Sequence, residues 1–482
     1  MGIAKLYGQK ASGMNINGII KDYHVYAGEN VSAGDLVEYI NGIASQRIET
    51  SSDVRLLETT QTADFISALA LDDKRVFIAH SYGSDWHLYG VVVTIDGTSI
   101  TCGTDTVISA TAYAGKVKSL ELLPNGNVFI AYSRSSSHYL NAIVCIVSGT
   151  TITAGTDTNI STSGNTGYAI STVTMSNNTI FMAYSYGSSY YLYGAIVKID
   201  GTTVKTEGTT KLIDTSNAGY SVSVEKVGEG EVFIVHSSGS SYTLNTCYCS
   251  ISGTTVTRGT KYSLSSNEKS GYGIKTKLLE ERKIFIAHCS GGANYLYGMI
   301  LTCTGSTISN GVDVLIADVN TSQSQELAVI NSGKALITYK YGTSYQLYST
   351  ICTVDGETIT PHTNTQLHTN SYTHESSIAV LQNGGIFIAH SDTSDYYLNG
   401  QVWGVDETNN TLTNDVPLSE YETQVRKTTT SQFDGVAKTS GIGGTTTVPK
   451  DYVSVYTLDT NFVTADGNAI MTADKNTFIT KQ

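Results

Sequence analysis

The chain has 482 residues, a formal net charge of −13 and a charged fraction of only 15%. Its 46 glycines and 32 tyrosines favour turns and strands over helices, so we expect an all-β protein. Lysine and arginine total 29 and form no cluster, which excludes a basic nucleic-acid-binding face and leaves the acidic excess as a contribution to solubility.

The N-terminal segment, residues 1–54, precedes any repeat. It begins with MGIAKLYGQKASGMNING, which has neither the apolar core nor the cleavage pattern of a signal peptide. No part of the chain approaches the roughly 18 apolar residues of a membrane-spanning helix. We therefore expect synthesis in a cytoplasm and no membrane insertion. Residues 28–42, GENVSAGDLVEYING, alternate in hydropathy and end on an Asn-Gly turn, which predicts short strands.

Residues 55–419 contain one sequence repeated seven times. Its first two copies read RVFIAHSYGSDWHLYG and NVFIAYSRSSSHYLNA. One anchor position recurs every 51 or 52 residues, at Phe77, Phe129, Phe181, Phe233, Phe285, Leu336 and Phe387. A second anchor has the same spacing, at Leu88, Leu140, Leu192, Leu244, Leu296, Leu347 and Leu398. Two independent anchors with one period establish the repeat.

Each repeat contains four strand-like runs. In the second repeat they read KVKSLELL, NVFIAYS, YLNAIVCIV and TTITAG with TDTNIS, separated by turn sequences. Four short strands per unit at a period near 50 residues are typical of a β-propeller, whereas a β-solenoid has much shorter coils. The sequence therefore predicts a seven-bladed β-propeller.

The ends of the array predict how the ring closes. Leu56 lies 21 residues before Phe77, as Ile108 lies 21 before Phe129, so Leu56 occupies a last-strand position ahead of the first repeat. The final repeat has its own candidate last strand near residues 411–418. We expect one of these strands to complete a blade begun at the other end, because closure removes an open sheet edge.

The two end segments, 1–54 and 420–482, do not match the repeat. Ring closure would bring them together, so we expect them to form one small β-rich domain into which the propeller is inserted. The second segment contains FDGVAKTSG at 433–441, DYVSVY at 451–456, and the paired tail sequences VTADGN at 463–468 and MTADKN at 471–476.

These end motifs, with VSAGDLVEYING at 31–42, resemble the small β-rich domains of tailed-bacteriophage virion proteins, such as decoration proteins and fibre attachment domains. The resemblance covers about a quarter of the chain. It implies a virion surface protein, made in the bacterial host cytoplasm and attached through its end domain. The implied partners are capsid or tail proteins and further copies of the chain.

Catalytic motifs are missing from the sequence. We find no HExxH, GxSxG, Walker A or GxGxxG pattern, so we expect no catalytic residue, no cofactor and no metal. Asp85, Asp392 and Asp395 occupy equivalent loops and are the carboxylates that a glycan-degrading enzyme would use. The cysteines are seven in number without a CxxC pair, which favours buried thiols over disulfides or metal ligands: Cys102, Cys145, Cys247, Cys249, Cys289, Cys303 and Cys352.

One repeat position alternates histidine and tyrosine. Its members are His80, Tyr132, Tyr184, His236, His288, Tyr339 and His390. A metal-binding or catalytic ring is one interpretation. The other is a side chain that packs between blades with its polar tip hydrogen-bonded, which the free exchange of tyrosine favours.

The loop after the second strand of each repeat is rich in aromatic residues. In propeller topology this loop shares a face with the connections between blades, so one face would carry a ring of aromatics beside serine, asparagine and aspartate. Such faces bind sugars or peptides. Alternatively these rings begin the third strand and pack between blades. The candidate ligand-binding residues are Trp86, His87, His138, Tyr139, Tyr190, Tyr191, Tyr242, Tyr295, Tyr345, Tyr396 and Tyr397.

Three functions follow from these patterns. The first is a non-enzymatic phage virion protein that projects its propeller, as a capsid decoration or head fibre, or as a tail-fibre component that recognises host surface polysaccharide. The second is a lectin-like, carbohydrate-binding propeller. The third is a glycan-degrading enzyme on the same fold.

Overall fold

The computed structural model describes residues 20–27, 36–40, 53–59, 65–96, 99–116, 118–176, 178–213, 215–304, 307–321, 324–342, 346–368, 375–382, 384–392, 396–406, 409–413, 424–427, 435–437 and 452–458. Its regular structure consists of β-strands within these ranges. No helix in the described ranges is long and apolar enough to cross a membrane. The chain divides into two compact units, residues 48–415, and residues 1–47 together with 416–482.

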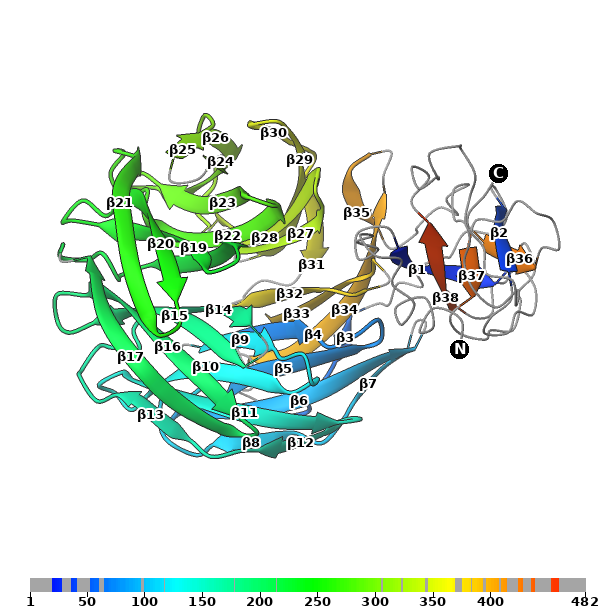
Figure 1. Cartoon of the computed structure of the whole chain (residues 1–482), viewed down its shortest axis with the longest axis horizontal. Helices are drawn as coiled ribbons and strands as arrows, with labels where there is room; N and C mark the ends of the chain where they lie inside the picture. The colour runs from blue at the N-terminus through cyan, green and yellow to red at the C-terminus, as the bar shows by residue number, and fades with distance from the viewer. Residues whose placement is uncertain are drawn as a thin grey trace, which may run out of the picture. The chain divides into compact units, whose positions relative to one another are not determined.

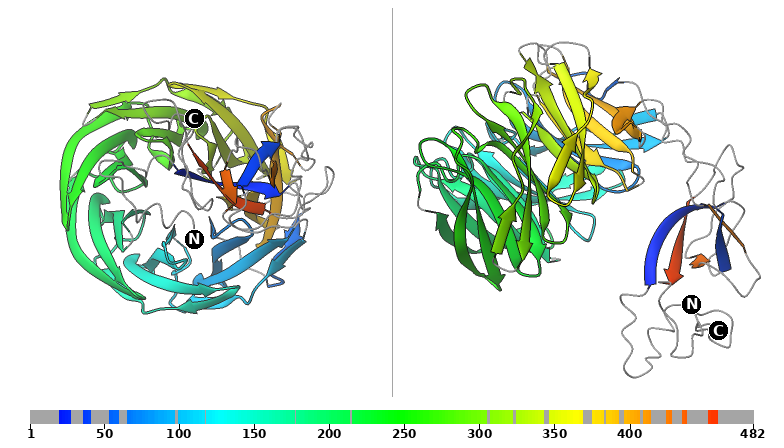
Figure 2. Two further views of the ribbon diagram at one scale, coloured as in Figure 1. Left: turned by 45° about the vertical axis from the view of Figure 1, so that its right-hand side comes forward. Right: turned by 90° about the horizontal axis from the view of Figure 1, so that it is seen from above.

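Residues 48–415 form a seven-bladed β-propeller, which confirms the predicted all-β fold (Figures 1 and 2). Each blade is an antiparallel sheet, and in six of the seven blades the strands follow one another in the chain. The first strands of neighbouring blades contact one another in turn, and the first strand of the last blade contacts that of the first. These seven strands therefore form the inner ring around the propeller axis.

The strands of the seven blades are the following. Blade 1 contains β4 (Ile66–Ala70), β5 (Arg75–Tyr82), β6 (His87–Asp96), β7 (Ser99–Cys102) and β8 (Thr106–Ser109). Blade 2 contains β9 (Lys118–Leu122), β10 (Val128–Arg134), β11 (Tyr139–Ser148), β12 (Thr151–Ala154) and β13 (Thr158–Ser161). Blade 3 contains β14 (Ile170–Ser176), β15 (Thr179–Tyr186), β16 (Tyr191–Asp200) and β17 (Thr203–Ile213). Blade 4 contains β18 (Val222–Gly228), β19 (Glu231–Ser238), β20 (Thr243–Ser252) and β21 (Thr255–Ser265). Blade 5 contains β22 (Tyr272–Glu280), β23 (Lys283–Ser290), β24 (Tyr295–Thr304), β25 (Thr307–Asn310) and β26 (Val314–Ala317). Blade 6 contains β27 (Glu326–Asn331), β28 (Lys334–Tyr341), β29 (Gln346–Asp355), β30 (Thr358–Pro361) and β31 (Thr365–His368). Blade 7 contains β32 (Ser376–Val380), β33 (Ile386–Asp392), β34 (Tyr397–Asp406), β35 (Thr411–Thr413) and β3 (Val54–Arg55).

Blade 7 combines strands from both ends of the repeat array. Its β32 to β35 belong to the last repeat, whereas β3 precedes the first repeat. β3 runs antiparallel to β34, with Val54 opposite Gly400. The Leu56 N–H donates to the Leu398 carbonyl at 2.8 Å, and β35 pairs with the other half of β34. The structure thus confirms the predicted closure of the ring.

The second strand of each blade is buried on both faces because neighbouring blades cover it on both sides. This explains why it reads as a continuous apolar run rather than as an alternating one. In blade 3 the ring of Phe181 is fully buried and lies against Gly194 on the third strand. A Cβ at Gly194 would lie 2.9 Å from that ring, so the glycine leaves the space that the phenylalanine fills.

The first strands carry a column of serines beside the propeller axis. In β9 and β14, the Ser119 hydroxyl accepts a bond from the Thr172 N–H at 3.2 Å, which joins blade 2 to blade 3. The column occupies one register position of five blades: Ser67, Ser119, Ser171, Ser223 and Ser377. Blades 5 and 6 have Lys275 and Glu326 at this position, and the two form an ion pair. The column therefore changes from neutral hydroxyls to charged groups on one side of the axis.

Residues 1–47 and 416–482 contribute the strands of a closed five-stranded barrel, in the order β1-β36-β2-β37-β38. The strands are β1 (Ile20–Ala27), β2 (Leu36–Ile40), β36 (Gln424–Lys427), β37 (Gly435–Ala437) and β38 (Tyr452–Leu458). Two strands come from the N-terminal segment and three from the C-terminal segment, so neither segment supplies the barrel alone. The tail motifs at 463–468 and 471–476 lie outside the described residues.

Candidate functional site

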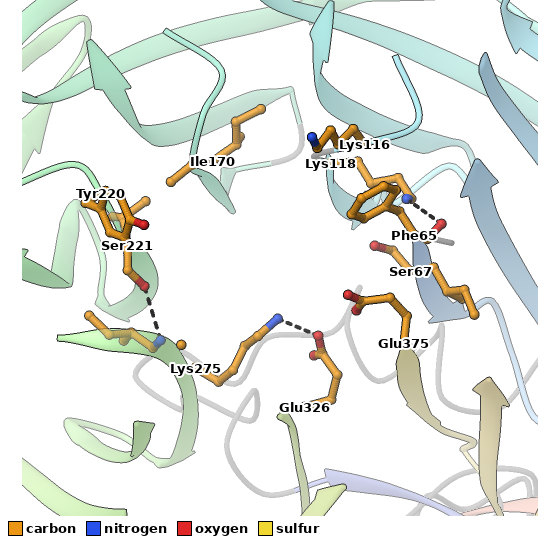
Figure 3. A pocket seen from close by; sticks show the side chains of 15 residues that line it. Phe65, Ser67, Lys116, Lys118, Ile170, Tyr220, Ser221, Lys275, Glu326 and Glu375 are labelled. Carbon is orange, nitrogen blue, oxygen red and sulfur yellow. Dashed lines mark hydrogen bonds and ion pairs between the residues drawn. The ribbon is translucent and has the colours of Figure 1, made fainter. Parts of the chain in front are cut away.

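A pocket of about 280 Å³ lies at one end of the propeller axis, where the first strands begin (Figure 3). Residues from all seven blades line it. The lining includes Phe65, Ser67, Lys116, Lys118, Ile170, Tyr220, Ser221, Lys275, Glu326 and Glu375. Its volume lies just below the range of small-ligand pockets, which begins at roughly 300 Å³. The pocket therefore has room for about one sugar ring.

Charged side chains line much of the pocket. Lys118 Nζ donates to the carbonyls of Phe65 and Gly115, both at 2.9 Å. Across the pocket Lys275 is paired with Glu326, and the carboxyl group of Glu375 points into the pocket (Figure 3). Enclosure raises the pKa of Glu375 to about 7, and the charge of Glu326 acts in the same direction. Glu375 therefore changes its charge near neutral pH.

In six of the blades, the residue that ends the loop between the second and third strands has a positive φ. In blade 1 the Trp86 N–H donates to the Gly83 carbonyl at 3.1 Å. The left-handed conformation recurs, with φ from 50° to 54°, at Trp86, His138, Tyr190, Tyr242, Asn294 and Tyr396. Asparagine adopts it readily, whereas a bulky ring costs on the order of 1 kcal/mol. Five of these six residues carry a ring, and the sixth is asparagine.

The connection to the next blade holds the turns of blades 1 to 4 in place. The Gly115 N–H donates to the Trp86 carbonyl at 2.7 Å, and Gly219 does the same for Tyr190 at 2.6 Å. A Cβ at Gly115 would lie 2.7 Å from the His87 carbonyl oxygen, so only glycine permits this approach. These bonds place loops and connections on the same face, as the topology predicted.

Aromatic side chains from the turns alternate with aromatic side chains from the connections. We call the continuous set the tyrosine row: His138, Tyr168, Tyr190, Tyr220, Tyr242 and Tyr272. Successive ring centroids in this order are 5.7, 4.8, 5.7, 4.8 and 4.8 Å apart. All six side chains are half-buried, and Tyr220 also lines the pocket. The row therefore leads along the face to the pocket.

A second aromatic group lies beside the pocket at blade 1. We call it the tryptophan cluster: Phe65, Trp86, Tyr113 and Lys116. The Trp86 centroid is 5.2 Å from Tyr113 and 6.4 Å from Phe65. Lys116 Nζ lies 5.3 Å from the Trp86 centroid and 5.9 Å from that of Phe65. Burial lowers the pKa of His138, and the charge of Lys116 lowers it further, so Lys116 also lies near the start of the tyrosine row.

The other predicted ligand-binding residues do not join these groups. His87, Tyr139, Tyr191, Tyr295 and Tyr397 are the first residues of third strands. Lys211 Nζ lies 4.5 Å from the Tyr191 centroid, and the Arg55 guanidinium lies 3.8 Å from that of Tyr397. Tyr396 has the conformation of the row residues, and Tyr345 lies outside the described residues. The structure thus separates each adjacent pair of predicted rings into two environments.

The alternating histidine and tyrosine position lies inside the blades. His80 Nε2 is 2.9 Å from Asp105 Oδ1, and the same pairing joins His288 to Asp313 and His390 to Asp53, at 2.9 and 3.0 Å. These imidazoles are fully buried and hydrogen-bonded, which matches the packing interpretation. Within the described ranges no three His, Cys, Asp or Glu side chains form a group that could hold a metal ion.

The cysteines are free thiols, and all but the half-buried Cys102 are buried. Of the three loop carboxylates, Asp85 is exposed at its turn. Asp395 and the side chain of Asp392 lie outside the described part of the chain. Asp85 does not line the pocket.

Sequence reasoning missed the half of the site that the connections and first strands supply. Tyr168, Tyr220 and Tyr272 are 52 residues apart, so the repeat period contained a signal for them. Lys275 and Glu326 interrupt the serine column, which was also visible in the aligned repeats. Lys116 gave a similar signal, because its repeat position holds tyrosine in the next three repeats.

No protein-family model and no curated protein sequence matches this chain. Among solved structures, it is similar to a 6-phosphogluconolactonase-like protein from Bacteroides fragilis, with 10% identity and a TM-score of 0.53 over 74% of this chain and 98% of that one. A similar protein from Bacteroides uniformis has 9% identity and a TM-score of 0.51 over 73% and 100%. A fucose-recognising lectin from the fungus Aleuria aurantia has 11% identity and a TM-score of 0.41 over 64% and 98%. The two Bacteroides likenesses support the propeller fold alone.

Proposed function

We propose that this protein is a non-enzymatic carbohydrate-binding propeller, and that its tyrosine row and the adjoining pocket form the binding face. The observation that carries the proposal is the row itself. Six half-buried rings follow one another across three blade connections, and the two turn tyrosines, Tyr190 and Tyr242, adopt a backbone conformation that bulky rings disfavour.

The chemistry of the row suits a sugar chain. Ring faces stack on the apolar faces of sugars, and the phenol hydroxyls donate and accept hydrogen bonds at their edges. Burial raises the pKa of Tyr168 and Tyr272, and the neighbouring tyrosines add to that effect, so these hydroxyls stay protonated at neutral pH. Tyrosine also loses little conformational entropy on binding. Such a surface offers contacts to several successive sugar units.

The test replaces Tyr190 and Tyr242 together by alanine. Loss of two stacking rings of about 1 kcal/mol each predicts a Kd for a bound oligosaccharide about 30-fold higher, measured by calorimetry after a glycan-array screen. Tyr295→Ala is the matched control, because this tyrosine is exposed but lies outside the row. Absence of any bound glycan, or full affinity in the double variant, would refute the proposal. Release of reducing ends during binding would instead favour the glycan-degrading enzyme.

The barrel carries a second proposed role, that of attachment to a phage virion. The motifs that resemble phage decoration and fibre domains flank or contain β2, β37 and β38, which the barrel brings into one sheet. In this role the barrel holds the chain on a capsid or tail, and the propeller is presented to host surface polysaccharide. Other virion proteins and further copies of the chain are the partners.

Immunogold electron microscopy with antibody to residues 80–400 tests this second role on particles from a producing culture. Label over the head is the result expected for a decoration or head-fibre protein, and label at the tail tip for a host-recognition component. Particles without label would contradict virion attachment and would leave the carbohydrate-binding proposal standing.

A further inference from the structure

The pocket has an excess of ammonium groups, although the whole chain has a net charge of −13. Three lysines and two glutamates line it. Glu326 is neutralised by its ion pair with Lys275, and both lie on the side formed by blades 5 and 6. The other two lysines, Lys116 and Lys118, lie together on the blade 2 side (Figure 3). Two ammonium groups therefore come from the side of the pocket beside the tryptophan cluster.

Lys116 is held by aromatic rings rather than by a carboxylate. Its ammonium lies near the ring faces of Trp86 and Phe65, where cation–π attraction stabilises it. Among the described residues it makes no ion pair, in contrast to Lys275. Lys118 is anchored next to it by the carbonyls of Phe65 and Gly115. An anion entering the pocket would meet two lysines whose positions are already fixed.

We propose that the pocket selects a negatively charged sugar residue, whose anionic group faces Lys116 and Lys118 while its ring lies between Phe65 and Tyr220. This inference rests on the proposed carbohydrate-binding function and names the class of glycan. The shared chemistry is a carboxylate or phosphate group on a sugar unit. Neutral units of the same chain would lie on the tyrosine row.

Glu375 gives the proposal a pH dependence. The charged groups that act on it are Lys340, Glu326, Lys275 and Lys118. Below pH 7 its carboxyl is neutral and the pocket becomes more positive, whereas above pH 7 its negative charge repels the anion. Affinity for a charged glycan should therefore be higher at pH 6 than at pH 8. Glu375→Gln should remove most of that difference.

The experiment compares three oligosaccharides of equal length by calorimetry on the full-length protein. One is neutral, one carries uronate carboxylates and one carries phosphates. Binding of either charged ligand at least about tenfold tighter than the neutral one is the expected result, and the tighter of the two identifies the anionic group. Lys116→Met should abolish this preference, so that the ratio of the neutral-ligand Kd to the charged-ligand Kd falls to about one. Lys74→Met is the matched control, since Lys74 is exposed and paired with Asp96 away from the pocket.

Salt titration of the wild-type protein gives a second measurement that needs no variant. Affinity for the charged ligand should fall between about 50 and 300 mM salt, while affinity for the neutral ligand should not. Equal binding of neutral and charged ligands, or an unchanged preference in Lys116→Met, would overturn the charge selection. Charge selection can fail while the proposed function holds. That outcome would be equal binding of neutral and charged ligands together with loss of neutral-glycan binding in the Tyr190 and Tyr242 double variant.

Discussion

Asp53→Ala is expected to lower the free energy of unfolding of the propeller by about 3 kcal/mol, as for removal of one partner from a buried ion pair. Asp53 precedes the closing strand β3 and bonds to His390 Nε2 and His368 Nε2, both at 3.0 Å. It also accepts a bond from Asn399 Nδ2 at 3.3 Å. His368 belongs to blade 6, and His390 and Asn399 belong to blade 7. The Asp53 carboxylate therefore joins the segment before β3 to both of these blades.

The same pairing inside single blades provides controls for this prediction. Asp105→Ala and Asp313→Ala each remove one carboxylate from one buried histidine, with no role in closure. We expect each to cost about half as much, measured by urea unfolding at pH 7. Equal losses in all three variants would show that closure depends on backbone pairing alone.

Asp53 also predicts how the closure responds to acid. Burial acts to raise the pKa of Asp53, but the bonds and charges of His368 and His390 outweigh it and lower the pKa below 3.8. The pKa of Asp53 is lower in the folded state than in the unfolded state. The stabilisation that its bonds provide is therefore fully present above about pH 4 and is lost as the pH falls through the folded-state pKa.

His236→Tyr is expected to flatten the dependence of stability on pH between 6.5 and 4. Burial lowers the pKa of His236 to about 4, and the nearby charge of Lys261 adds to the effect. Between pH 6.5 and 4 the His236 imidazole is therefore protonated in the unfolded chain but not in the folded chain. The free energy of unfolding falls as the pH drops through this range. A difference of about 2.5 pKa units corresponds to about 3 kcal/mol.

Tyrosine is the natural replacement because blades 2, 3 and 6 have Tyr132, Tyr184 and Tyr339 at the equivalent position. The comparison uses urea midpoints at pH 6.5 and pH 4.5, so a constant cost of fitting the new ring cancels. Tyr184→His is the reverse control and should steepen the dependence in blade 3. An unchanged slope in His236→Tyr would mean that another group governs the acid sensitivity.

The sequence was sufficient to predict the propeller because its evidence is repeated seven times. A single strand pattern such as that around Phe77 is ambiguous, but seven copies at one spacing are not. Ring closure was predictable for the same reason, since Leu56 stands at a known repeat position without a repeat before it. The role of Asp53 in ring closure was not predictable. Nothing in the sequence around Asp53 indicates that two distant histidines will bond to its carboxylate.

The site was only half predictable. Trp86, His138, Tyr190 and Tyr242 stood out as aromatic loop residues, but their grouping depends on a left-handed turn that composition does not show. Tyr168 and Tyr220 interleave with them only once the connection folds against that turn. Predicting the pocket would have required aligning the first strands of the repeats residue by residue. Only that alignment shows that Lys275 and Glu326 replace serines of the other repeats.

The origin of the barrel from both chain ends sets the order in which this protein can assemble. β2 ends at Ile40 and its neighbour β36 begins at Gln424, so nearly the whole chain lies between two paired strands. Closing an unstructured loop of that length costs about 5 kcal/mol, whereas a folded ring that returns to its starting point leaves only two short links to close, at a cost of about 3 kcal/mol. During synthesis β1 and β2 cannot pair with β36, β37 and β38 until the whole repeat array has been made. Barrel formation is therefore favoured once the ring is complete, and in the proposed virion role a particle that recognises the barrel would favour finished propellers.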